Sequence, residues 1–85
     1  MKWYRPISAR LPILLPDLGV PAATFSLWHV VEGDRVTMGE RLAEVLIPGV
    51  AVELQAEAGG VLSQVIVRPG DVLSTGEVLG VIDAE

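Results

Sequence analysis

An internal repeat constrains the fold of this sequence more than any other feature. It aligns VEGDRVTMGERLAEV (31–45) with RPGDVLSTGEVLGVI (68–82) at a constant offset, so that residue 31 matches residue 68 and residue 45 matches residue 82. Both halves have the pattern of a strand, a Gly-Asp turn, a Gly-Glu turn and a second strand. A unit of this kind cannot bury its apolar face alone, so the two are expected to pack together with approximate two-fold symmetry.

The repeated Gly-Asp pairs, Gly33-Asp34 and Gly70-Asp71, are predicted to form structural turns. Glycine tolerates a positive φ without steric cost, and an aspartate side chain accepts hydrogen bonds from amides of its own turn. The repetition therefore explains Asp34 and Asp71 as turn residues rather than as a catalytic pair of carboxylates.

Short apolar runs separated by Gly, Pro and Asp predict an all-β chain. The expected strands are 11–15, 24–31, 41–46, 50–56, 61–67 and 78–82, with two shorter extended pieces at 35–36 and 72–73. A helix competes only at residues 38–46, which contain good helix formers. Gly39 and the match to the second half favour a strand there as well.

Composition narrows the range of functions. Eighty-five residues make one small domain. The net charge of −5 and the six basic residues argue against a nucleic-acid surface. No cysteine is present, and the single histidine, His29, has no second metal ligand at a plausible spacing. We therefore expect no metal site and no enzymatic activity.

No membrane span is expected, because the apolar runs fall well short of about 18 residues. Basic residues precede an apolar segment near the N-terminus, but Pro12 and Pro16 interrupt that segment and no small-x-small cleavage site follows. A cytoplasmic location is the resulting expectation. The apolar fraction of 51% is high for a chain of this size, so some apolar side chains must stay exposed or meet a partner.

Three segments carry a resemblance to a known family: LPDLG (15–19), TFSLWHVVEGDRVTMGERLAEV (24–45) and AEAGGVLSQVIVRPGDVLSTGEVLGVI (56–82). In this order they resemble the lipoyl domain, whose sister family is the biotinyl carrier domain. The resemblance implies a flattened barrel-sandwich of two four-stranded antiparallel sheets with pseudo-two-fold symmetry. It divides the chain into an N-terminal tail, 1–10, and a lipoyl/biotinyl-like domain, 11–85.

In that family a lysine at the tip of a β-hairpin carries lipoate or biotin as a swinging arm. The lipoyl domain typically has Glu-Thr-Asp-Lys-Ala there, and the biotinyl domain has Ala-Met-Lys-Met. This sequence has Leu-Ile-Pro-Gly-Val (46–50), which puts Pro48 at the aspartate position and Gly49 at the lysine position. Lys2 is the only lysine in the chain and lies outside the resemblance. No lipoate or biotin is therefore expected, although Pro48-Gly49 suits a tight turn.

The apolar hairpin suggests a non-catalytic binding or assembly module, with a protein or a second copy of the chain as its partner. Its working surface would combine Leu46, Ile47 and Val50 with Val20 and Pro21 of the adjacent loop. The simpler alternative is that alternate hairpin side chains face the core. The resemblance also allows an accessory carrier-type domain of a 2-oxoacid dehydrogenase or a biotin-dependent carboxylase system, which would work with a non-covalent ligand or in trans.

Five other residues have simple structural interpretations. Trp28 is expected in the core, because it matches Val65 in the repeat, and His29 is expected on the surface of the same strand. Three acidic residues are expected to form a solvated face near the hairpin, and they are Glu44, Glu53 and Glu57. The resemblance offers recognition by partner enzymes as the alternative role of such a face.

Residues 1–10 contain half of the basic residues of the chain, together with Trp3 and Tyr4. They are expected to form a loosely packed tail. The two aromatic side chains are alternatively expected to cover exposed core, in the same or a neighbouring copy. Both interpretations stay open.

The loop around residues 19–23 breaks the repeat. Aligning PDLG (16–19) with AEAG (56–59) gives an offset larger by three than that of the rest of the repeat. The first half is therefore expected to carry three extra residues in this short, uncharged loop.

Overall fold

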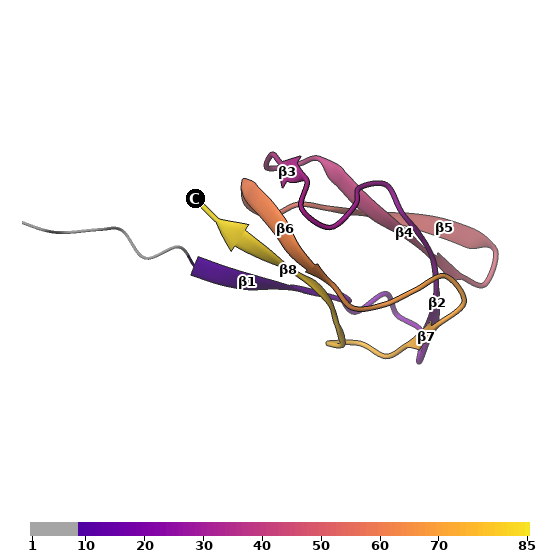
Figure 1. The fold of residues 1–85 in the computed structure, drawn as a ribbon. Helices are drawn as coiled ribbons and strands as arrows, with labels where there is room; N and C mark the ends of the chain where they lie inside the picture. Colours follow the sequence, from indigo (N-terminus) through magenta and orange to yellow (C-terminus); the bar gives the residue numbers. More distant parts are fainter. Residues whose placement is uncertain (1–8) are drawn as a thin grey trace, which may run out of the picture.

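The computed structural model describes residues 9–85, which form two four-stranded antiparallel sheets (Figure 1). One sheet has the strand order β1-β8-β6-β3 and the other has the order β5-β4-β2-β7. The strands are β1 (Ala9–Leu14), β2 (Ala23–Trp28), β3 (Arg35–Val36), β4 (Arg41–Ile47), β5 (Val50–Gln55), β6 (Gly60–Val65), β7 (Val72–Leu73) and β8 (Val78–Ala84). The predicted all-β sandwich is confirmed.

The strand bounds follow the predicted ones closely, and β3 and β7 match them fully. The helix considered for residues 38–46 is wrong, because β4 pairs with β2 on one side and β5 on the other. The second strand ends at Trp28 and not at Val31. It ends early because Val31 already belongs to the Gly-Asp turn, where its carbonyl oxygen accepts a hydrogen bond of 3.0 Å from the Asp34 amide.

The two-fold symmetry extends to the register of individual residues. Thr24 pairs with Leu46 in one sheet, and the equivalent Val61 pairs with Asp83 in the other. The edge strands obey the same rule, because Ala23 lies opposite Leu73 in one sheet and Gly60 lies opposite Val36 in the other. The repeat in the sequence is therefore a repeat of hydrogen-bond register, as expected for two copies of one supersecondary unit.

The loop between β1 and β2 is one residue longer than predicted. Val78 and Arg41 are equivalent positions of the repeat. Leu14 pairs with Val78 and Gln55 pairs with Arg41, so Leu14 is the counterpart of Gln55. The connection 15–22 then replaces the connection 56–59, so the first half carries four extra residues and not three. The sequence alignment on the shared glycine of the two loops missed this, because that glycine does not have the same place in both connections.

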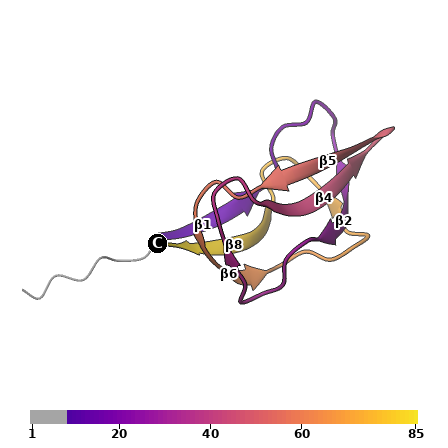
Figure 2. The ribbon, with the colours of Figure 1, turned by 90° about the horizontal axis from the view of Figure 1, so that it is seen from above.

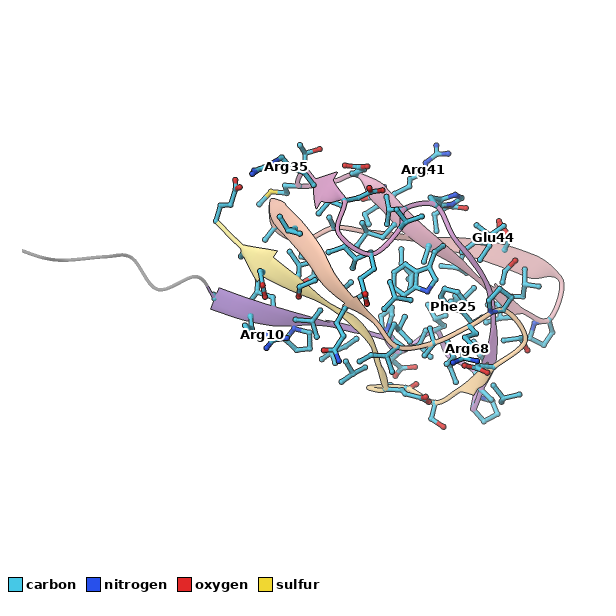
Figure 3. All side chains as sticks on the ribbon, viewed as in Figure 1. Arg10, Phe25, Arg35, Arg41, Glu44 and Arg68 are labelled. Carbon is cyan, nitrogen blue, oxygen red and sulfur yellow. The ribbon has the colours of Figure 1, made fainter. Side chains whose placement is uncertain are left out.

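The core lies between the two sheets and receives equivalent residues from both halves. Its largest fully buried side chains are Phe25, Leu42, Leu62, Leu73, Leu79, Val36 and Val45. Phe25 is visible inside the sandwich in Figure 3. The Trp28 ring lies 5.2 Å from the Phe25 ring, and its indole N–H donates to the Val67 carbonyl oxygen at 3.0 Å. Trp28 is half-buried and packs against the core, so its predicted core position applies in part.

The β4–β5 hairpin forms one end of the molecule, and the C-terminus lies at the other end (Figures 1 and 2). The start of β1 is also at the C-terminal end, since Ala9 pairs with Ala84. The hairpin tip is thus displayed far from both ends of the described chain. Among residues 9–85, no helix has the length and apolar character that a membrane crossing needs.

Candidate functional site

The tip of the β4–β5 hairpin is a two-residue turn. Ile47 pairs with Val50, and Pro48 and Gly49 connect them. The φ of Gly49 is 77°, close to the value of about +80° at the third position of a type II turn. A Cβ atom built on Gly49 would meet no atom within 4 Å. A side chain at this position would therefore point into open space, although only glycine adopts the backbone conformation without strain.

The apolar side chains at the tip differ in exposure. Ile47 is half-buried and packs against the core cluster, so the core interpretation applies to it in part. Leu46 and Val50 remain 41% and 53% exposed. The hairpin therefore presents two free apolar side chains next to one that is anchored in the domain.

A shallow hollow of about 370 Å³ lies beside the tip. The hairpin lines one side of it through Leu46, Ile47 and Pro48, and the other side comes from Ala22, Ala23, Thr24 and Val72. The predicted juxtaposition of the hairpin and the 19–23 loop thus occurs at the end of that loop. Val20 and Pro21 precede the lining residues, and Val50 lies on the next strand, outside the hollow.

Val72 is an exposed apolar residue of this surface that was not predicted from the sequence. It is 71% exposed in the short strand β7, where it pairs with Thr24. The repeat contains a signal for this exposed valine, because Val72 is the counterpart of Arg35. Where one half places an exposed arginine, the other half places an exposed valine beside the hairpin.

The two Gly-Asp turns are closed by their own aspartates, and the second of them, Gly70-Asp71, directly precedes Val72 of this surface. The φ values of Gly33 and Gly70 are 98° and 95°. The Asp34 carboxylate accepts a hydrogen bond from the Val31 amide at 3.0 Å, and the Asp71 carboxylate accepts one from the Arg68 amide at 2.9 Å. Both aspartates therefore act on the backbone of their own turns.

The acidic side chains lie along the hairpin strands and away from the tip. Glu44 and Glu53 face each other across β4 and β5, three residue pairs from the Ile47–Val50 pair. The Glu53 Oε1 atom lies 2.7 Å from Nε2 of the exposed His29. Glu57 lies further along, in the connection that follows β5. The tip itself therefore has an apolar surface without carboxylates.

The residues that line the hollow beside the tip are almost entirely apolar. Thr24 is the single polar side chain among the residues that line the hollow beside the tip. Within residues 9–85, no group of three His, Asp or Glu side chains is arranged to hold a metal ion. The expectations for Lys2, Trp3 and Tyr4 lie outside the described residues.

The family model described as "Biotin-requiring enzyme" matches residues 12–82 of this chain. Among curated proteins, the chain is 39% identical over 72 residues to the dihydrolipoyllysine-residue succinyltransferase component of the 2-oxoglutarate dehydrogenase complex of Bacillus subtilis. It is 37% identical over 70 residues to the corresponding component of Escherichia coli K12. These matches cover 82% and 80% of this chain but 17% of each relative.

A solved structure has the same fold. The lipoyl domain of the 2-oxoglutarate dehydrogenase complex from Azotobacter vinelandii superposes with a TM-score of 0.72 at 27% sequence identity. The match covers 88% of this chain and 99% of that domain. The chain thus corresponds in length to one domain of the much longer relatives.

Proposed function

The chain belongs to the biotin/lipoyl attachment domain family, and on that basis we propose that it is a lipoyl-like domain without a lipoyl or biotinyl group on its hairpin, which acts as a non-catalytic binding or assembly module. The observation that carries the proposal is Gly49 at the tip of an intact, well-paired hairpin. Attachment of either cofactor to this family's hairpin needs a lysine amine. Residues 3–85 contain no lysine.

The surface around the tip supports a binding role. Leu46 and Val72 are exposed apolar side chains that line the hollow beside the tip. Val50 is also exposed, at the start of the next strand and outside the hollow. Exposed apolar side chains gathered on one surface are typical of contact sites for other proteins. A turn that displays a lysine for modification has no need of such neighbours, whereas a turn that docks against a partner does.

If the proposal is right, we expect the chain to self-associate through this surface. Sedimentation velocity and concentration-dependent NMR shifts should show dimer formation at millimolar or lower concentration. Leu46→Lys should weaken it at least tenfold, because it removes apolar area from the contact and places a charge there. Leu46 is a better position for this test than Ile47, which packs against the core.

Val31→Lys is the matched control for that experiment. Val31 is also an exposed apolar residue, but it lies outside the hollow beside the tip. The control should associate as the native chain does. A native chain that stays monomeric at every concentration, or equal weakening by both substitutions, would contradict self-association through the tip.

The identity of the relatives favours a second candidate function. The curated relatives named above are acyltransferase components of 2-oxoglutarate dehydrogenase complexes, which suggests an accessory carrier-type role in such a system, or in a biotin-dependent carboxylase. The domain would then hold lipoate or biotin without a covalent bond, or work in trans.

Calorimetric titration with lipoamide and with biotin separates the two candidates. We expect no binding heat, because the tip offers almost no polar group to orient a ligand. Saturable binding would favour the carrier role.

A further inference from the structure

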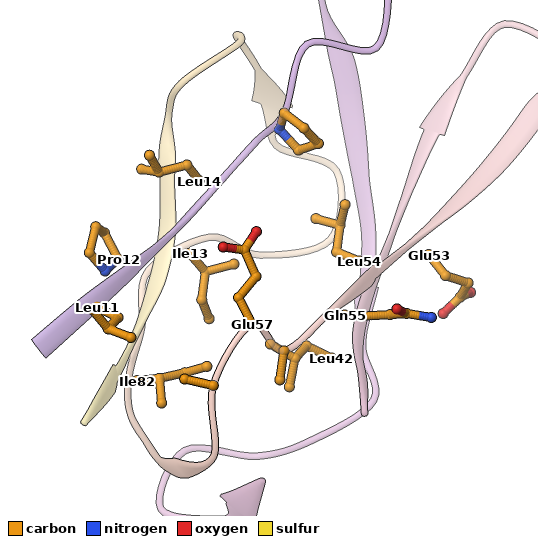
Figure 4. Close-up of a pocket in the computed structure, with 13 residues that line it drawn as sticks. Leu11, Pro12, Ile13, Leu14, Leu42, Glu53, Leu54, Gln55, Glu57 and Ile82 are labelled. Atoms are coloured by element: carbon orange, nitrogen blue, oxygen red, sulfur yellow. The ribbon is translucent and has the colours of Figure 1, made fainter. Parts of the chain in front are cut away.

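The two sheets have two long free edges in the part of the chain that the structure describes, β1 and β5. Each of these strands ends a sheet, whereas the other edge strands, β3 and β7, have only two residues each. A second hollow, of about 480 Å³, lies between the β1 and β5 edges (Figure 4). A free edge presents unpaired backbone N–H and C=O groups to which another strand can bind, unless the sequence blocks it.

The β1 edge is blocked by a proline. Pro12 lies within β1 and lacks a backbone N–H. It pairs with Val81, whose equivalent in the repeat is Glu44. Since Glu44 pairs with Glu53, Pro12 and Glu53 have equivalent places on the two edges. Proline in a sheet is tolerated where its nitrogen faces away from the neighbouring strand, so Pro12 interrupts the row of donors that an added strand would need.

The β5 edge is open, because VAVELQ contains no proline. Ile47 and Val50 flank the two-residue turn and form its closing hydrogen-bonded pair. Hydrogen-bonded and non-hydrogen-bonded pairs alternate along an antiparallel ladder, so Ala51 and Glu53 direct their N–H and C=O groups away from β4. Among residues 9–85, no hydrogen bond joins these backbone groups to another segment. They are therefore donors and acceptors for a further strand.

We propose that β5 pairs with β5 of a second copy of this chain, antiparallel and with Val52 opposite Val52. This register sets Ala51 of each copy opposite Glu53 of the other, and each of these pairs exchanges backbone hydrogen bonds in both directions. A register centred on Glu53 would set two carboxylates opposite each other, which destabilises a pair of strands. A register centred on Ala51 would set Glu53 opposite Gly49, in the turn beyond the end of β5.

A second copy suits this edge because the contact is self-complementary. An antiparallel pair of identical strands has a two-fold axis perpendicular to the sheet, so both copies keep the inner face of β5 on the same side. On that face, the exposed Val50 of each copy would lie opposite the buried Leu54 of the other. The hollows of the two copies would also face each other, and the exposed Leu11 and Leu14 of β1 line them. The pairing therefore covers apolar side chains in addition to the backbone groups.

This contact goes beyond the proposed function and does not depend on it, because the hollow beside the hairpin tip has no lining residue in β5. Leu46→Lys, which disables the tip, is therefore the background in which sedimentation velocity should measure it, and weaker dimers should remain there. Adding Glu53→Pro should weaken these dimers about tenfold or more, because it removes an outward N–H from each copy. The fold already accommodates a proline at the equivalent place, Pro12.

Glu53→Ala is the matched control in the same background. It removes the same carboxylate and its contact with His29, but it keeps the backbone N–H. The control should therefore associate at least as tightly as the Leu46→Lys chain. Equal weakening by proline and by alanine would overturn the proposal. A Leu46→Lys chain that is monomeric at every concentration would also overturn it, while the contact at the tip would stand.

NMR spectra of the unsubstituted chain give a test that does not depend on the folding of any variant. In a mixture of isotope-labelled and unlabelled chains, a filtered NOE should join the α-protons of Val52 in the two copies, because opposed residues of a non-hydrogen-bonded pair approach closely. Amide hydrogen exchange at Ala51 and Glu53 should slow as the concentration rises. Intermolecular NOEs confined to Leu46 and Val72 would overturn the β5 contact and support the contact at the tip instead.

Discussion

Replacing Phe25 by alanine is expected to lower the free energy of unfolding by about 3–5 kcal/mol. The ring is 1% exposed and contacts Trp28 at a centroid distance of 5.2 Å. The backbone of Phe25 also joins the two repeat units, since its amide donates to the Asp71 carbonyl oxygen and its carbonyl oxygen accepts from the Gly70 amide. A domain of this size has a total stability of about 5–15 kcal/mol, so the loss would remove a large part of it.

Urea denaturation followed by circular dichroism measures this effect. Leu27→Ala is the matched control, because Leu27 lies on the same strand but faces outward and is 38% exposed. The control should cost less than half as much as Phe25→Ala. Equal costs for the two substitutions would show that the core is not centred on the Phe25–Trp28 contact.

The double variant Pro48→Asp/Gly49→Lys is expected to accept a lipoyl group from a lipoate ligase. Its hairpin would then offer an amine at the tip of a turn whose strands keep their pairing from Ile47–Val50 downward. Gly49→Lys alone would hold a lysine at a φ near 77°, a region that costs an L-residue about 1–2 kcal/mol. Aspartate in place of Pro48 gives the turn more freedom to adopt the type I form, in which the third position has a negative φ.

Val50→Lys is the control that tests whether the lysine must stand at the apex of the turn. Val50 is the first residue of β5 and pairs with Ile47, so a lysine there would stand on the strand and not at the apex. Intact-mass analysis should show the added lipoyl group on the double variant and none on Val50→Lys. A folded double variant that stays unmodified would mean that the hairpin differs from a carrier hairpin in more than its missing amine.

Much of the fold could be predicted from the sequence because its main signal is local. The Gly-Asp and Gly-Glu turns recur at fixed spacing, and each turn is closed by short-range contacts such as those from Asp34 to Val31 and from Asp71 to Arg68. The strands between them then have little freedom in register. The one clear error in length, at the 15–22 connection, occurs where no repeated turn constrains the chain.

The candidate surfaces were harder to predict because they depend on which distant segments meet. Val72 became part of the tip surface only through its pairing with Thr24, 48 positions earlier in the sequence. Ile47 is partly buried because the core extends as far as the base of the hairpin turn. The alternation of apolar residues in the sequence does not indicate where along a strand the core ends. The hollow between β1 and β5 has no signal of its own, since it arises where two sheet edges stay apart.

The intact mass of the native chain, after incubation or co-expression with lipoate ligase and with biotin ligase, shows whether the domain accepts a covalent cofactor. We expect the mass of the unmodified polypeptide with both ligases, under conditions in which a carrier domain used as a positive control is fully modified. A gain of one lipoyl or biotinyl group on the native chain, with peptide mapping to locate it, would contradict the claim that this lipoyl-like domain works without a covalent cofactor.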